Sequence, residues 1–296
     1  MLIVLTGASG LIGSALKTRL AADGHRLRVL VRRPPVGMEE ASWNPAEASL
    51  DPAHLAGADA VINLAGAGVG DHRWTNTYKA TILQSRLQPA HLLARTIRGL
   101  GADAPATFLS ASAVGYYGDT QHHVVDETGA AGSGFLSDVC RQWEAATAEA
   151  DGISRVVHLR TGLVLSGAGG LLRRLRPLVD AGVGGPLGSG DQYQPWISIE
   201  DEVAAISFLL ESAVRGPVNL TGPDPVTQKH FIQTLARIRH RPALLRAPGF
   251  ALRLALGQFA DEGVLVGQRA VPAALTAAGY RFVHPTLEGA LRAALA

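Results

Sequence analysis

The sequence predicts an α/β fold built on a doubly wound parallel sheet with a smaller C-terminal lobe. Short apolar runs alternate with longer helix-compatible stretches over the first 166 residues, and three evenly spaced glycines follow the first run. Strands buried on both faces read as continuous apolar runs, and their alternation with helices is typical of parallel sheets. Strands are expected at 2–5, 27–31, 60–64, 107–110 and 154–159. Helices are expected at 11–22, 78–100 and 135–150.

The order of these elements also predicts where ligands bind. In a doubly wound sheet, ligands bind beyond the carboxyl ends of the strands. The five segments that follow the expected strands are 6–13, 32–35, 65–68, 111–118 and 160–166. Four of them contain glycine, which allows close backbone approach to a ligand.

After Gly167 the chain becomes rich in glycine and loses the regular alternation. We therefore divide it into three parts: a Rossmann core at 1–166, a substrate lobe with returning sheet elements at 167–242, and a small C-terminal domain at 243–296.

Composition narrows the class of protein. The chain has 296 residues, of which 47% are hydrophobic and 18% charged, so it can bury a sizeable core. The net charge is only +2 and the arginines are dispersed, which does not favour nucleic acid as a partner. No apolar run is long enough for a membrane span, and no basic leader precedes the first strand. A single cysteine, Cys140, leaves no intramolecular disulfide, and we expect a cytoplasmic protein.

The first loop has the pattern of a dinucleotide site. Gly7, Gly10 and Gly13 stand between an apolar run and a helix-compatible stretch. In such a loop the first glycine permits a tight turn, the second admits the pyrophosphate, and the third lets the helix pack closely. The helix N-terminus then offers free N–H groups to the anion. The alternative is an ordinary glycine-rich turn, but the strand before it and the helix after it favour the cofactor.

The end of the second strand predicts which cofactor binds. An NAD site normally has an acidic residue there for the ribose 2′-hydroxyl, whereas this chain has Arg32 and Arg33. Guanidinium groups pair with a 2′-phosphate, which a carboxylate would repel. The hydroxyl of Ser9 could add a donor. We therefore expect NADP(H), although solvated loop charges are the alternative for the two arginines.

Taken together, the motifs resemble those of the short-chain dehydrogenase/reductase superfamily, and its extended, epimerase/dehydratase type most of all. The matching segments are 6–13, 59–66, 108–118, 158–160 and 195–201. A narrower resemblance is to the branch with a C-terminal domain of unknown function, whose members are often labelled nucleoside-diphosphate-sugar epimerases. It is carried by Arg73, Trp74, Lys79, Ser85, Arg86, the segment 135–144, and the segments 252–257 and 267–272.

The resemblance implies a set of cofactor-binding residues around the strand ends. They are Gly7, Ser9, Gly10, Leu11, Ile12, Gly13, Arg32, Arg33, Leu64, Ala65, Gly66, Ser85, Ser110, Ala111 and Arg160. Arg160 could instead form a structural ion pair.

The resemblance also implies a catalytic set that this chain has only in part. The superfamily uses a Ser, a Tyr and a Lys four residues after the Tyr, because a phenol needs a nearby positive charge to exchange protons near neutral pH. Ser112 matches the Ser, although capping of a loop is an alternative role. The helix that begins at Phe135 has neither the Tyr nor the Lys.

Four side chains could take over part of the missing chemistry. Tyr116, which we place in the catalytic set with Ser112, or Tyr117 could supply a phenol, and packing of the loop is the alternative for both. Lys79 could lie near the pocket with Arg73 and Trp74, or be a solvated helix charge. Cys140 could act only as an accessible, acidic thiol, and a buried side chain is the simpler expectation.

Two functions therefore remain open. The first is an NADP(H)-dependent oxidoreductase or epimerase-like enzyme that acts on a small molecule. The second is a protein that binds NADP(H) without catalysis. We expect no metal site, because the stretch with His122, His123, Asp126 and Glu127 lacks the spacing of a zinc helix. Trp196 could stack on a substrate or belong to the core. Relatives commonly pair as homodimers, through helices such as 78–100 and 135–150.

Overall fold

The fold is a Rossmann-like α/β arrangement around one eight-stranded sheet, which confirms the predicted fold class. A computed structural model describes all residues from 1 to 296. The strand order is β12-β8-β6-β5-β1-β2-β3-β4, and every neighbouring pair is parallel except the antiparallel β3–β4 edge. The strands are β1 (Leu2–Thr6), β2 (Arg26–Val31), β3 (Glu40–Asn44), β4 (Ser49–Leu50), β5 (Ala60–Asn63), β6 (Thr107–Ala113), β8 (Arg155–Thr161) and β12 (Gly216–Leu220).

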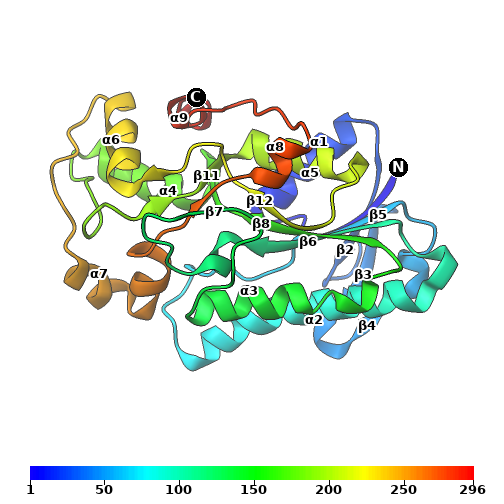
Figure 1. Ribbon diagram of the computed structural model, residues 1–296. Coiled ribbons are helices and arrows are strands. Elements are labelled where there is room, and N and C mark those ends of the chain that lie inside the picture. Colours follow the sequence, from blue (N-terminus) through cyan, green and yellow to red (C-terminus); the bar gives the residue numbers. More distant parts are fainter.

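Helices cover both faces of the sheet, as Figure 1 shows. Helices α1 (Leu11–Ala22) and α5 (Ile199–Glu211) pack together on one face, and α2 (Asn76–Leu100) and α3 (Phe135–Ala145) on the other. Successive residues of a strand point to opposite faces. Ile3 of β1 therefore joins the apolar cluster under α1 and α5, whereas Val4 joins the cluster under α2. Both side chains are fully buried, so the sheet separates two dry layers.

Two differences from the predicted elements matter for the site. Strand β6 continues to Ala113 rather than ending near Ser110, because it stays paired with β8 up to the Ala113–Thr161 position. Ser112 and Arg160 are therefore partners inside the sheet and do not lie in loops after it. The second difference is that two strands not predicted from the sequence, β3 and β4, extend the sheet beyond β2.

The part of the chain after β8 returns to the sheet and then wraps around it. Its short strands are β9 (Leu163–Ser166), β10 (Tyr193–Gln194), β11 (Trp196–Ser198), β13 (Val226–Thr227) and β14 (Arg269–Ala270), which pairs with β7 (Val124–Val125). Its helices are α4 (Gly170–Asp180), α6 (Gln228–Ile238), α7 (Gly249–Leu256), α8 (Ala273–Ala277) and α9 (Leu287–Leu295). The apolar residues of α8 and α9 join cores that earlier elements begin.

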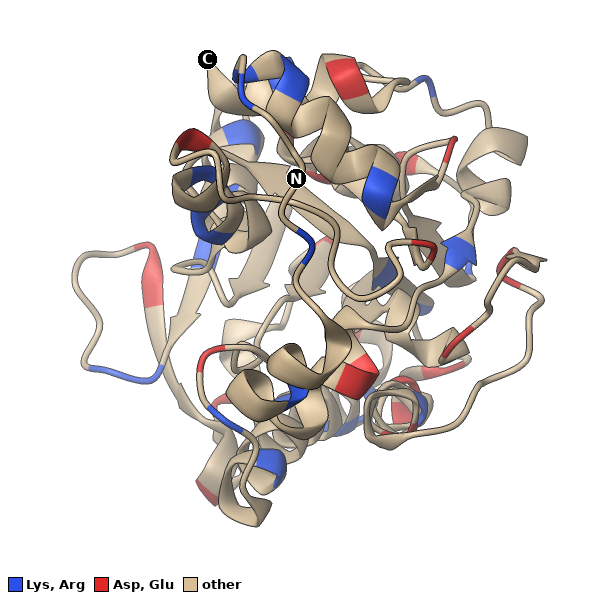
Figure 2. Ribbon diagram, turned by 90° about the vertical axis from the view of Figure 1, so that its left-hand side faces the viewer, with Lys and Arg blue, Asp and Glu red and all other residues tan.

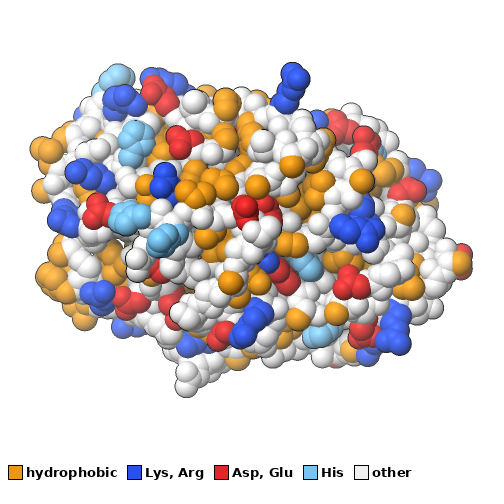
Figure 3. Space-filling model, in the orientation of Figure 1, with side chains coloured by type: hydrophobic (Ala, Val, Ile, Leu, Met, Phe, Trp, Pro, Cys, Tyr) orange, Lys and Arg blue, Asp and Glu red, His pale blue; other side chains and the backbone are white.

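The surface has no region of a single charge sign that dominates the views. Figure 2 shows acidic and basic residues scattered over the ribbon, and on the face in Figure 3 both signs lie among apolar side chains. None of the helices combines the length and apolar character needed to cross a lipid bilayer.

Candidate functional site

The glycine loop after β1 is shaped partly by the protein and partly by open space. A Cβ on Gly7 would lie 2.5 Å from the carbonyl oxygen of Leu64, and Gly7 also has a positive φ of 70°. A Cβ on Gly13 would collide with the carbonyl oxygen of Gly7. By contrast, a Cβ on Gly10 would meet only that same oxygen, at 3.4 Å. The fold therefore requires glycine at positions 7 and 13, whereas glycine at position 10 leaves room for a group outside the protein.

The helix that follows the loop presents an uncapped N-terminus. Gly10 is the N-cap residue of α1, no side chain caps the helix, and its first turn has no acidic residue. The first N–H groups of a helix have no partners within the helix, and the helix dipole places partial positive charge there. This end of α1 is thus suited to an anion, and the space at Gly10 adjoins it.

A groove with a volume of about 900 Å³ runs from this loop along the carboxyl ends of the strands. Nine of the residues predicted to bind a cofactor line it, namely Gly7, Ser9, Gly10, Arg32, Arg33, Leu64, Ala65, Gly66 and Ser85. The remaining six, Leu11, Ile12, Gly13, Ser110, Ala111 and Arg160, do not line this groove. The structure thus brings the sequence-distant strand ends of β1, β2 and β5 to one cavity.

The two arginines after β2 differ in their contacts. Arg33 donates two hydrogen bonds to the carboxylate of Glu40, at 2.7 and 2.6 Å, whereas Arg32 forms no ion pair. Both arginines and Glu40 line the groove. The hydrogen bond from Arg33 lowers the pKa of Glu40, so this carboxylate stays ionised. Sequence reasoning missed Glu40 because it lies on β3, a strand that the sequence pattern did not predict.

Two serines near the groove, Ser85 in its wall and the buried Ser110, bond to the protein itself. The Ser85 hydroxyl accepts a hydrogen bond from the backbone N–H of Ala67 at 3.0 Å, which fixes the loop after β5 to α2. Ser110 is fully buried, and its hydroxyl oxygen lies 3.4 Å from the amide nitrogen of Asn63. These two side chains hold the groove walls together.

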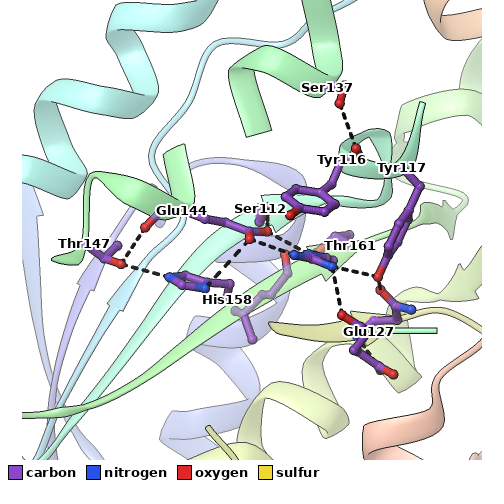
Figure 4. Close-up of polar contacts among 12 residues, drawn as sticks. Ser112, Tyr116, Tyr117, Glu127, Ser137, Glu144, Thr147, His158 and Thr161 are labelled. Carbon is purple, nitrogen blue, oxygen red and sulfur yellow. Dashed lines mark hydrogen bonds and ion pairs between the residues drawn. The ribbon is translucent and has the colours of Figure 1, made fainter. Parts of the chain in front are cut away.

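Beyond the groove, side chains from β6 and β8 bond to the carboxylate of Glu144 on α3 (Figure 4). The Ser112 hydroxyl donates to one carboxylate oxygen of Glu144 at 2.7 Å. Arg160 donates to both carboxylate oxygens, each at 2.8 Å. Burial opposes the charged form of Arg160, but its bonds to Glu144 raise the pKa of the guanidinium above its usual value. The pair therefore anchors α3 to β8.

Arg160 uses most of its donors inside this network. A guanidinium has five N–H donors, and besides Glu144 this one donates to the Tyr117 hydroxyl at 2.9 Å and to the Glu127 carbonyl at 3.4 Å. The Arg160 side chain is only 3% exposed. It forms the structural ion pair that the sequence left as an alternative.

Tyr117 and Glu127 connect this network to the C-terminal section. The Tyr117 hydroxyl donates to the side-chain oxygen of Asn219 at 2.8 Å, and burial raises the pKa of this tyrosine. The Glu127 carboxylate accepts hydrogen bonds from the backbone N–H groups of Asn219 and Ala274. The Tyr117 hydroxyl thus joins the turn after β6 to β12, and Glu127 holds α8 against β12. The Trp196 ring is also buried, so it belongs to the core.

Tyr116 is the phenol that this network leaves free. Its ring lies beside the Ser112–Glu144–Arg160 group, and the central guanidinium carbon of Arg160 is 3.6 Å from the ring centroid (Figure 4). Its side-chain hydroxyl forms no hydrogen bond within the chain, and the residue is partly exposed. The backbone carbonyl of Tyr116 accepts from the Ser137 hydroxyl, which fixes the turn on α3.

The stripe of α3 that faces the end of β6 has neither a phenol nor an ammonium group. A Cβ added to Gly115 would lie 3.7 Å from Leu136 and 3.9 Å from the Cys140 sulfur, and Glu144 contacts Ser112. These three residues follow one another at four-residue spacing along one face. Leu136 and Cys140 therefore occupy the stripe of α3 nearest the turn after β6, and neither can exchange a proton as a phenol or an ammonium group does. Burial raises the pKa of Cys140 to about 12, so its thiol is inert.

Phe135 and Lys79 meet on a different side of α3. The Lys79 ammonium lies 4.6 Å from the centroid of the Phe135 ring and donates to Gln258 at 3.0 Å. The ring of Trp74 contacts both Phe135 and Phe259. Lys79 is thus neither a free surface charge nor a contact of Ser112, and it joins α2 to the C-terminal section.

The parallel sheet, the glycine loop and the groove across the strand ends define the class of the protein, which is an NAD(P)-binding Rossmann fold. The chain belongs to the NAD-dependent epimerase/dehydratase family, whose family model matches residues 3–221. A second model, for a domain of unknown function, matches residues 247–294. The conventional Tyr–Lys pair is therefore missing from a chain whose family membership is clear.

Similar proteins span nearly the whole chain. An epimerase family protein of Mycobacterium bovis is 48% identical over 98% of this chain and 96% of its own length. The chloroplastic epimerase family protein SDR39U1 homolog of Arabidopsis thaliana is 36% identical over 99% of this chain and 86% of its own. The crystal structure of human epimerase family protein SDR39U1 (isoform 2) with NADPH is 31% identical, covers 99% of this chain and 98% of that one, and has a TM-score of 0.91.

Proposed function

We propose that the protein binds NADP(H) in the groove and acts as an oxidoreductase or epimerase-like enzyme of the extended short-chain dehydrogenase type. The observation that carries the proposal is the open space at Gly10 beside the uncapped N-terminus of α1. A glycine that the fold does not need, next to free N–H donors, fits a bound diphosphate. The similar human structure with NADPH supports the same assignment.

The phosphorylated cofactor is favoured over NAD(H) by the arginines at the end of β2. Arg32 has no ion-pair partner and lines the groove, so its guanidinium is available for a 2′-phosphate. Arg33 is fixed beside it by Glu40. The carboxylate of Glu40 is held by Arg33 and by the backbone N–H of Val36, which directs its lone pairs away from the role of a ribose acceptor.

The cofactor, when bound, supplies or accepts a hydride. The protein's part is then to bind the substrate beyond the end of β6 and to move one proton. Tyr116 is the group that can do so, because its hydroxyl is free and lies at the end of β6. The hydroxyl proton of Ser112 is directed to Glu144, so Ser112 orients the network and can only accept from a substrate hydroxyl. A small carbonyl compound or a nucleotide sugar is the proposed substrate class.

Isothermal titration of cofactor-free protein with NADPH and NADH tests the first half of this proposal. We expect NADPH to bind at least tenfold more tightly, because only NADPH has a phosphate for Arg32. Equal binding of both nucleotides, or binding of neither, would contradict the assignment.

The second half is tested by single-turnover hydride transfer, followed by the absorbance of NADPH with a panel of carbonyl and nucleotide-sugar substrates. We expect Tyr116→Phe to reduce turnover about 100-fold or more while the affinity for NADPH stays unchanged. Tyr117→Phe is the matched control, since its hydroxyl is bound to Asn219. Activity that survives Tyr116→Phe would exclude this residue as the proton donor.

A second function, binding of NADP(H) without catalysis, is favoured by Leu136 and Cys140 on the stripe of α3 nearest the turn after β6, where neither exchanges a proton as a phenol or an ammonium group does. It predicts tight NADPH binding and no turnover with any member of the panel.

A further inference from the structure

Arg86 of α2 is a half-buried cation without an anionic partner. Its one hydrogen bond within the chain is a donation to the backbone carbonyl of Ile82 at 2.9 Å, and no carboxylate lies within ion-pair distance. Its guanidinium instead lies over the ring of Trp143, 5.0 Å from the centroid. Burial lowers the pKa of Arg86, because desolvation disfavours the charged form of the guanidinium. A buried charge normally has a partner, because desolvation of an unpaired ion is costly.

The position of this guanidinium is as informative as its lack of a partner. A Cβ on Gly66, in the groove wall after β5, would lie 3.4 Å from the Cγ and Cζ atoms of Arg86. On its other side, the charge of Arg86 acts on the Cys140 thiol of α3. Arg86 is therefore placed between the groove wall at Gly66 and the Trp143 ring of α3.

Apart from the Ile82 carbonyl that Arg86 already bonds, its neighbours Trp143 and Cys140 offer donors. The indole N–H of Trp143 is buried and has no hydrogen-bond partner. The Cys140 thiol is protonated, since its pKa is raised to about 12. A ligand that fits beside Arg86 must therefore bring acceptor oxygens of its own.

We propose that Arg86 binds the ribose-phosphate of the nicotinamide half of NADP(H), so that a guanidinium from α2 takes the place of the lysine that α3 lacks. This inference rests on the proposed function. A dinucleotide spans the switch point of a doubly wound sheet, with one nucleotide on each side of β1. The arginines after β2 lie on the adenosine side, so Gly66 and Arg86, after β5, lie on the nicotinamide side. Arg86 is thus a cofactor-positioning residue that sets the nicotinamide ring opposite Tyr116.

The test compares two ligands that differ only in this half. NADPH contains both nucleotides, whereas adenosine 2′,5′-bisphosphate contains the adenosine half alone. By isothermal titration, we expect Arg86→Met to weaken NADPH binding roughly 10- to 100-fold, the loss typical of a charge-assisted hydrogen bond. Binding of adenosine 2′,5′-bisphosphate should stay within about twofold of wild type. Arg86→Lys should keep most of the NADPH affinity, because it retains the charge.

A swap of the cation between helices sharpens the test. In the double variant Arg86→Met with Cys140→Lys, the charge returns to α3, and we expect NADPH affinity to recover to within about fivefold of wild type. Thermal melting establishes that each variant is folded. If the double variant does not fold, the contrast between Arg86→Met and Arg86→Lys decides the matter.

The outcomes separate this inference from the proposed function. Wild-type protein that binds neither ligand contradicts the proposed function itself. If wild-type protein binds NADPH and the Arg86→Met variant binds it equally well, only the inference is overturned. Equal weakening of both ligands in Arg86→Met also overturns it, since that result indicates a structural role in the helix pair.

Discussion

The candidate site has two halves that are built in opposite ways: the groove, and the side chains that lie beyond it around the end of β6. The glycine-loop half consists of the loop at residues 6–13 and the end of β2, and its features come from two short, continuous segments. The β6 half consists of Ser112, Tyr116, Arg86, Glu144 and Arg160, which come from β6, the turn after it, α2, α3 and β8. The first half is formed by residues close together in the sequence, whereas the second forms only when distant segments pack together. The first half should therefore tolerate little change in backbone shape, and the second little change in buried charge.

The largest expected effect follows from removing the cation of the β6 half. Arg160→Met leaves the Glu144 carboxylate buried without its partner, and breaking a buried ion pair costs about 3–5 kcal/mol. Urea unfolding should report this loss. Arg98→Met is the control, because its partner Glu149 is 3.3 Å away and both side chains are exposed, so the pair contributes little. A loss below about 1 kcal/mol for Arg160→Met would mean that the network does not anchor α3 to β8.

The next effect is a dependence of stability on pH, which comes from α5 on the other face of the sheet. Glu202 lies under the end of β8, accepts a hydrogen bond from Thr161 at 2.8 Å, and has a second carboxylate oxygen without a partner. Burial raises its pKa to about 8. The folded state thus keeps a proton that the unfolded state releases above its ordinary pKa near 4.5. The free energy of unfolding should fall by about 1.4 kcal/mol per pH unit as pH rises toward 8, and then level.

Glu202→Gln removes this titration, so its stability should change less between pH 5.5 and pH 8 than that of the wild type. Glu211→Gln, at the exposed end of the same helix, is the control. Identical pH profiles for the wild type and Glu202→Gln would show that this carboxyl group is ionised in the folded protein.

The glycine-loop half should respond to a single methyl group. Gly13→Ala brings a Cβ into the carbonyl oxygen of Gly7, and such overpacking costs about 1–3 kcal/mol. Gly10→Ala adds the same methyl group where the protein leaves room, so stability should stay near that of the wild type while NADPH affinity falls. Thermal unfolding and titration, measured on both variants, separate the two roles. Equal loss of stability in both would remove the distinction between a glycine that the fold needs and one that the ligand needs.

The smallest expected effect on the fold is that of Arg33→Gln. The Arg33 side chain is 55% exposed, so its pair with Glu40 contributes little to stability. We expect an unchanged melting temperature and a preference for NADPH over NADH that falls about tenfold, because the freed Glu40 carboxylate then lies beside the 2′-phosphate. Arg26→Gln, at the opposite end of β2, is the control. An unchanged preference would assign the 2′-phosphate to Arg32 alone.

The same difference between the halves explains which features of the fold and of the site the sequence predicts. Glycine spacing, apolar runs and the basic pair after β2 are local patterns, and they predict the fold class and most of the groove lining. The position of Ser112 inside β6 was missed, because pairing with β8 extends the strand beyond its apolar run. Glu40 was missed for a similar reason, since β3 mixes polar and apolar residues instead of forming an apolar run.

Contacts between distant segments explain the remaining errors. Glu144 falls in the motif that carried the family resemblance, but nothing local shows that it would bind Ser112 and Arg160. Likewise, the sequence did not show that Leu136 and Cys140 would face the turn after β6, because the face that α3 presents is set by packing. An additional signal was available for Arg86, which lies next to Ser85 in a motif singled out for resemblance alone.

The C-terminal section packs on earlier parts of the chain, and this affects folding during synthesis. Synthesis proceeds from the N-terminus, so the glycine loop and the central strands leave the ribosome long before Leu287 and Leu291 do. Those two side chains complete the apolar cluster that contains Phe231 and Leu235 of α6. Until the last helix emerges, part of that cluster stays exposed to water. The nascent chain therefore passes through an aggregation-prone intermediate of the kind that chaperones bind.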